Sequence, residues 1–146
     1  MNKIVNAALA ALPPDATRAT QIPTPRAPGL IGNFLDVFGR PRRQVVCECE
    51  RSSDGSVGQA LVMINGDLIN RKIAYPQGRL QALLKDPGKA DLEVLDELYL
   101  ATLSRHPTSA EAADAVSLVR SATTRRDGFH DLMWGLLNCR EFLFNH

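Results

Sequence analysis

The residues best suited to chemistry are two cysteines, Cys47 and Cys49, which are separated by Glu48. From Gln44 to Arg51 the side-chain pattern alternates with the period of an extended strand, so both thiols are expected on one face. Same-face neighbours on a strand lie roughly 6.5–7 Å apart, at the long end of the separation that a relaxed disulfide tolerates. A bond between these two sulfurs would therefore require local bending of the backbone.

Three interpretations of the cysteine pair stay open. Free cysteines are most often buried and inert, so Cys47 and Cys49 can be small apolar packing residues, with Glu48 and Glu50 facing solvent or pairing with nearby arginines. A redox pair is the second interpretation. A metal site is the third interpretation and ranks last. Cys-x-Cys is not the usual zinc spacing, and a tetrahedral site would have to recruit the distant Cys139 or a histidine.

Three arginines, Arg40, Arg42 and Arg43, surround a proline just before the cysteines. Guanidinium groups match oxyanions, so these side chains could bind an anionic polysaccharide or a phosphate. Acidic residues are interleaved with them, however, so ion pairs within the segment can account for the charge, including pairs of Glu48 or Glu50 with Arg51. A stripe that binds nucleic acid would not be interleaved in this way.

Length and composition bound the class of protein. The 146 residues are 45% hydrophobic, which is enough for one domain that buries roughly two thirds of its unfolded surface. Seventeen basic residues against sixteen acidic ones give a net charge of +1, which argues against a duplex nucleic acid or an anionic membrane as partner. No apolar run reaches the length of a membrane span. Three cysteines are too few for a disulfide framework.

The expected fold is mainly α, a multi-helix orthogonal or antiparallel bundle with one short extended segment near residues 44–51. Residues 1–12 are predicted to form a residual amphipathic helix. Residues 13–33 are rich in proline and glycine, which predicts an extended strap over the surface. Residues 34–146 are then the helical domain.

A capping box made by Ser56 and Gln59 predicts the start of one helix. Because residues 60–64 are apolar all round, we expect this helix to be central and buried. Gly66 follows an asparagine and predicts a left-handed C-terminal stop.

The last third of the chain is predicted as three helices joined by short connections, which makes them antiparallel neighbours. The second of these helices opens with a capping box of Thr108 and Glu111. His106 is expected to interact with carbonyl groups at the preceding helix end, and His130 is expected to be a solvated helix residue. A surface face of the first helix carries three carboxylates, Glu93, Asp96 and Glu97.

No constellation of residues in the sequence dictates a reaction. It contains no serine in a nucleophile elbow, no glycine-rich phosphate loop and no His-Glu pair with metalloprotease spacing. The paired carboxylates lack the apolar surroundings that raise a carboxyl pKa for acid catalysis. We therefore expect no catalytic residues and no cofactor. Enzymatic activity stays open, with a structural or interaction role favoured.

Several short motifs occur in a fixed order from about Thr20 to the end of the chain. They are Phe34-Leu35-Asp36-Val37-Phe38-Gly39-Arg40-Pro41, Cys47-Glu48-Cys49-Glu50-Arg51-Ser52, Gln59-Ala60-Leu61 with Asn65-Gly66, Glu97-Leu98-Tyr99-Leu100-Ala101-Thr102-Leu103-Ser104-Arg105 with Pro107-Thr108, and Leu136-Leu137-Asn138 with Glu141-Phe142-Leu143-Phe144-Asn145-His146. Taken together, the sequence resembles the C-terminal domain of unknown function found at the end of large planctomycete surface proteins, which often also carry a cytochrome-c-like domain.

The resemblance implies an extracytoplasmic protein, in the periplasm or at the cell surface, with no established activity for this domain. The chain has no convincing signal peptide, so a cytoplasmic location also stays open. The resemblance further implies that the chain is a truncated C-terminal part. Its expected partners are then upstream domains of a longer protein or a separate protein, and an exposed apolar face would favour self-association.

An alternative function also follows from the resemblance: a redox or enzyme-accessory subunit that works with a cytochrome-c-like partner through Cys47 and Cys49. At the position of Cys139 the family looks more like serine, which argues against a metal site built from all three cysteines.

Overall fold

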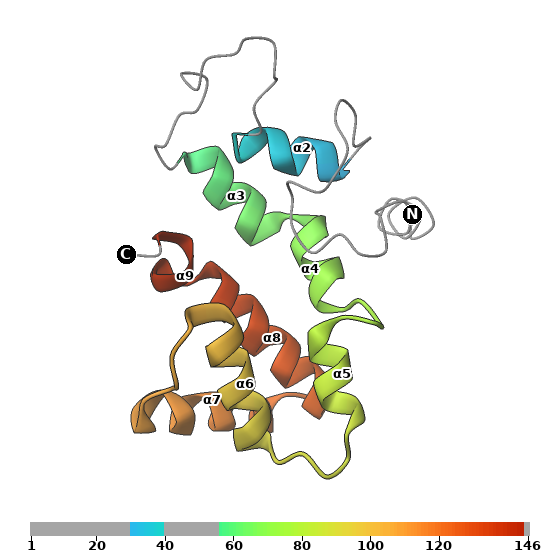
Figure 1. The fold of residues 1–146 in the computed structure, drawn as a ribbon, viewed down its shortest axis with the longest axis vertical. Coiled ribbons are helices and arrows are strands. Elements are labelled where there is room, and N and C mark those ends of the chain that lie inside the picture. The colour runs from blue at the N-terminus through green and yellow to red at the C-terminus, as the bar shows by residue number, and fades with distance from the viewer. Residues whose placement is uncertain (1–29, 40–55, 145–146) are drawn as a thin grey trace. The chain divides into compact units, whose positions relative to one another are not determined.

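The computed structural model describes residues 30–39 and 56–144, and every element in these ranges is a helix (Figure 1). The helices are α2 (Leu30–Val37), α3 (Val57–Asn65), α4 (Asp67–Ile73), α5 (Arg79–Lys85), α6 (Asp91–Leu103), α7 (Ser109–Ser121), α8 (Arg125–Asn138) and α9 (Arg140–Phe144). The predicted mainly α fold is confirmed. The helix predicted at residues 1–12, the extended segment near residues 44–51 and most of the predicted strap lie outside the described residues.

The chain divides into two compact units, Met1–Leu68 and Ile69–His146. In the described part of the first unit, α2 and α3 pack against each other. The second unit contains α5 to α9, and α8 contacts α5, α6, α7 and α9 within it. Its helices therefore gather around α8.

The helix α2 begins inside the predicted strap, so the prediction of an extended backbone is wrong for residues 30–33. Ile31 is buried, and Phe34 and Leu35 follow it at helical spacing and are half-buried. Burying an apolar side chain of this size contributes about 1.5–3 kcal/mol, whereas a glycine inside a helix costs about 1 kcal/mol relative to alanine. The apolar face therefore outweighs the helix-breaking tendency of Gly32.

The helix α3 starts where its capping box predicts. The Ser56 hydroxyl accepts a hydrogen bond from the Gln59 N–H at 3.2 Å, and the Gln59 side chain accepts one from the Ser56 N–H at 3.2 Å. The left-handed stop predicted at Gly66 is wrong, because this residue has a φ of −71°. The next helix begins at Asp67, directly after Gly66, so an extended residue makes the connection.

The prediction that α3 is central and buried is also wrong. Met63 is its buried residue, whereas Val57, Leu61 and Ile64 are 77%, 54% and 45% exposed. A run that is apolar all round does not reveal how many of its sides will find a partner. In the described part of its own unit, α3 packs against α2.

The core of the second unit is formed by apolar residues of α6, α7 and α8. Its most completely buried side chains are Val94, Leu95, Leu98 and Phe129, none more than 1% exposed. The capping box predicted for α7 is confirmed, since Thr108 and Glu111 exchange backbone-to-side-chain hydrogen bonds. The three helices predicted in the last third of the chain correspond to α6, α7 and α8.

The helices α7 and α8 lie in close contact at Gly128. A β-carbon placed on this glycine would lie 2.7 Å from the Cα and 2.8 Å from the carbonyl oxygen of Val119. Side-chain carbons do not come this close to backbone atoms. Glycine at position 128 is therefore what allows the two backbones to touch.

Candidate functional site

The cysteine pair and the arginine cluster lie outside the described residues. This holds for Arg40, Arg42, Arg43, Cys47, Glu48, Cys49, Glu50 and Arg51. The redox, metal and polysaccharide hypotheses for these residues therefore stay predictions. Cys139 is described: it is half-buried, follows α8, and its Sγ accepts a hydrogen bond from the Phe142 N–H at 3.4 Å.

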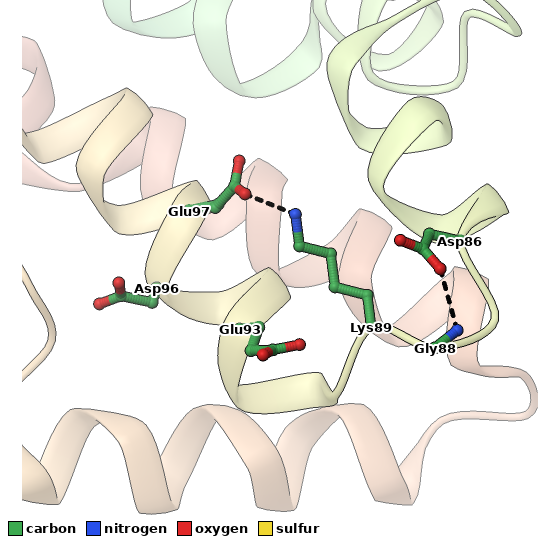
Figure 2. Close-up of a pocket in the computed structure, with 6 residues that line it drawn as sticks. All are labelled: Asp86, Gly88, Lys89, Glu93, Asp96 and Glu97. Atoms are coloured by element: carbon green, nitrogen blue, oxygen red, sulfur yellow. Dashed lines mark hydrogen bonds and ion pairs between the residues drawn. The ribbon is translucent and has the colours of Figure 1, made fainter.

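A pocket of about 490 Å³ opens beside the connection between α5 and α6 (Figure 2). Its lining is strongly charged and comes from six residues, Asp86, Gly88, Lys89, Glu93, Asp96 and Glu97. Four carboxylates and one ammonium group thus line the pocket, which carries net negative charge. Three of these carboxylates were expected on a surface face of α6, and Glu93 is indeed exposed while Asp96 and Glu97 are half-buried.

The ammonium group in the pocket is held by one of the carboxylates. Figure 2 shows Lys89 extending to Glu97, with Nζ and Oε1 2.5 Å apart. The hydrogen bond to Glu97 raises the pKa of Lys89, and nearby carboxylates act in the same direction. A lysine nucleophile needs a lowered pKa, so Lys89 is suited to an ion pair and not to covalent catalysis.

A second pair at the edge of the pocket joins Asp96 to His106. The Asp96 carboxylate lies 2.5 Å from Nδ1 of His106. The sequence predicts that His106 interacts with carbonyl groups at the helix end, but in the structure it pairs with Asp96. The reason is the end of α6, where Ser104 adopts a left-handed conformation with a φ of 58° and the chain reverses.

Among the described residues, no group of three histidine, cysteine, aspartate or glutamate side chains could hold a metal ion. His130 is half-buried, and its Nδ1 lies 3.7 Å from the Asp131 carboxylate.

Arg105, just after α6, is held by two carboxylates. Its Nη1 and Nη2 donate to the two carboxylate oxygens of Glu111 at 2.9 and 2.8 Å. Its Nε and Nη2 donate to the carboxylate of Glu141 at 2.7 and 2.8 Å. The guanidinium carbon also lies 5.6 Å from the centre of the Tyr99 ring. We call Arg105, Glu111 and Glu141 the Arg105 cluster, which joins the end of α6 to α7 and α9.

Electrostatics in the Arg105 cluster favour the ionised forms. Hydrogen bonds from Arg105, and then from Thr108, lower the pKa of Glu111 to about 2. The same guanidinium lowers the pKa of Glu141. Burial raises the pKa of Tyr99, which therefore stays neutral beneath the guanidinium. These groups stabilise a corner of the fold, and none of them is poised to exchange protons near neutral pH.

The Arg105 cluster should make stability depend on acidity. The pKa of the Glu111 carboxyl group is about 2 in the folded chain, whereas its ordinary value is 4.5. The ionised carboxylate therefore stabilises the fold above pH 4.5, and this contribution is lost as the pH falls toward 2. In Arg105→Met the slope of unfolding free energy against pH should therefore be smaller in this window. Chemical denaturation at several pH values measures it. Arg120→Met, which removes an exposed arginine of α7, is the matched control and should keep the wild-type slope.

Sequence reasoning missed the contribution of Asp86, Gly88 and Lys89 to the pocket. The signal was a turn sequence, Asp86-Pro87-Gly88, in which the Asp86 side chain accepts a hydrogen bond from the Gly88 N–H at 3.0 Å. This turn brings Lys89 back toward α6. The Arg105 cluster was also missed, because Glu141 lies 36 residues further along the chain.

None of the described helices is long and apolar enough to cross a membrane. Residues 12–119, well over half of the chain, match the family PSD1, which is described as "Protein of unknown function (DUF1553)". The match includes α2 to α6 and most of α7. It agrees with the domain of unknown function inferred from the ordered motifs. No curated protein and no solved structure matches the chain.

Proposed function

We propose that this chain, which belongs to the PSD1 family of proteins of unknown function (DUF1553), is a structural or interaction module and not a catalyst. Its place would be a larger extracytoplasmic or envelope-associated system. The resemblance to planctomycete surface proteins supports this location. The partner would be an upstream domain of a longer protein, a separate protein or another copy of the chain.

The observation that carries this proposal is the apolar surface of α3. Val57, Leu61 and Ile64 are between 45% and 77% exposed, although the helix has no charged residue. Exposed apolar groups that cluster on one element are typical of a surface that binds another protein. A helix with this composition gains stability when a partner removes it from water.

Charged side chains of the second unit support the same interpretation, because they connect its own helices. Lys89 pairs with Glu97, and Nε of Arg125 pairs with Asp91 at 2.7 Å. The Arg105 cluster joins the end of α6 to α7 and α9. This use of ionisable groups is typical of a scaffold.

A photo-crosslinking amino acid at position 61, introduced in the native host, tests the proposal. We expect crosslinks from position 61 to a protein partner, and we expect these products in the envelope or periplasmic fraction. The same amino acid at position 118, which is 44% exposed on α7, is the control and should give few products. Equal absence of products from both positions contradicts an interaction role for α3, and products in the cytoplasm contradict the location.

A further inference from the structure

A single residue separates two helices of the second unit. The helix α8 ends at Asn138 and α9 begins at Arg140, so Cys139 makes the whole connection (Figure 1). The φ of Cys139, −73°, is already close to the value of about −63° in an α-helix, whereas its ψ of 155° is extended. A rotation about one backbone bond, which brings this ψ to about −42°, would therefore make residues 125–144 one continuous helix.

Backbone hydrogen bonds favour such a continuous helix. Where one helix ends and another begins, the last carbonyl groups and the first N–H groups lack helical partners. At this break the Phe142 N–H donates to Sγ of Cys139 at 3.4 Å, and sulfur is a weak acceptor. A continuous helix would instead pair the N–H groups of residues 140–142 with the carbonyl groups of residues 136–138. The bent form also leaves Oδ1 of Asn138 buried with no hydrogen-bond partner among the described residues, which costs free energy.

Two sets of contacts favour the bent form that the structure shows. Arg105, at the end of α6, donates to both carboxylate oxygens of Glu141 at 2.7 and 2.8 Å. Phe142 and Leu143 are half-buried, and α9 contacts α6 and α8. Each set contributes little, because the Glu141 side chain is 47% exposed in this ion pair and none of the residues of α9 is buried. The backbone hydrogen bonds of a continuous helix can therefore compete with these contacts.

We propose that α9 is a hinged latch, which exchanges between the bent form held by Arg105 and a released form in which it continues α8. The hinge is Cys139, whose ψ angle takes up the change. Release separates Glu141 from the guanidinium group and uncovers the edge that it occupies. The hydrogen bonds from Arg105 to Glu111 do not involve α9, so the corner between α6 and α7 is kept. This device does not depend on the role proposed for α3.

Two substitutions at the hinge should shift the latch in opposite directions. In Cys139→Ser the hydroxyl oxygen is a stronger acceptor than sulfur for the Phe142 N–H, which favours the bent form. In Cys139→Ala this acceptor is lost, and alanine has the highest helix propensity. The ratio of released to bent form should therefore be about fivefold higher in Cys139→Ala than in Cys139→Ser. Carbon chemical shifts of residue 139, measured by NMR spectroscopy on the full chain, distinguish a helical from an extended ψ.

Loss of the ion pair should release the latch without any change at the hinge. Glu141→Gln should raise the ratio of released to bent form about two- to fivefold, the range expected for an exposed ion pair. Sodium chloride at about 1 M should act in the same direction on the wild-type chain, because salt screens exposed charges. Glu97→Gln is the matched control: it removes a carboxylate that pairs with Lys89 on α6 and should leave the shifts of residue 139 unchanged.

In the released form, residue 139 and residues 140–144 should all have helical chemical shifts. The latch is overturned if residue 139 stays extended in both Cys139→Ala and Glu141→Gln. It is also overturned if residues 140–144 lose their helical shifts in these variants, because α9 would then fray and not continue α8. Unchanged shifts in α6 and α7 check that each variant stays folded, and the salt series on the wild-type chain needs no substitution.

Discussion

Replacing Gly128 by alanine is expected to lower the free energy of unfolding by about 2–3 kcal/mol, one of the two largest effects that we predict. The new methyl group would lie 2.7 Å from the Cα of Val119 and 2.8 Å from its carbonyl oxygen. These atoms belong to the backbone of α7, so α7 and α8 must move apart to make room. Alanine is favoured over glycine in a helix by about 1 kcal/mol, which is too little to offset this separation.

Gly135 is the matched control for Gly128, because it lies on the same helix and a methyl group added to it would meet no atom within 4 Å. Gly135→Ala should therefore raise the free energy of unfolding by about 0.5–1 kcal/mol. Urea denaturation followed by circular dichroism measures both variants. If both changes had the same sign, the close contact of α7 and α8 at Gly128 would be wrong.

Phe129→Ala should lower the free energy of unfolding by about 3–5 kcal/mol, the other large effect. Phe129 is 1% exposed, and the guanidinium carbon of Arg125 lies 5.4 Å from the centre of its ring. Truncation removes the buried ring and leaves a cavity in the core of the second unit. Thermal unfolding measures the loss, and Phe129→Leu, with an expected cost of about 1.5 kcal/mol or less, serves if the alanine variant does not fold.

Phe144 allows the same substitution at an exposed position. It is 51% exposed on α9, so Phe144→Ala removes much less buried surface and should cost about 1 kcal/mol or less. The comparison keeps the substitution constant and changes chiefly the burial of the ring, from 1% to 51% exposed. Similar losses for Phe129→Ala and Phe144→Ala would contradict the position of Phe129 at the centre of the core.

The features that could be predicted from sequence are those whose partners are close in the chain. Ser56 and Gln59, and Thr108 and Glu111, each form a capping box over three residues, and both boxes occur as predicted. Helical periodicity in the last third of the chain likewise identifies α6, α7 and α8. Such signals depend on backbone geometry that a helix imposes by itself.

The features that could not be predicted depend on distant partners. The run at residues 60–64 indicates a helix but not the number of its neighbours, and α3 is therefore exposed where burial was expected. Gly128 looks like an ordinary helix residue until α7 is placed against it. At Gly66 the local preference for a left-handed stop is overridden by the helix that begins at Asp67.

The candidate sites divide in the same way. The carboxylates of α6 were placed correctly on its surface by periodicity, but their pairing with Lys89 and His106 follows from the turns before and after the helix. The chemistry predicted for Cys47 and Cys49 stays a prediction, since both lie outside the described residues.

The Arg105 cluster also suggests an order of events during folding. Arg105 meets Glu111 across a separation of 6 residues and Glu141 across a separation of 36. Closing the longer loop costs about 1.5 kcal/mol more in chain entropy, and α9, with its five residues, is too short to be helical alone. The corner between α6 and α7 should therefore form first. Arg105, oriented by Glu111, then presents its remaining edge to Glu141, and α9 becomes a separate helix as it docks.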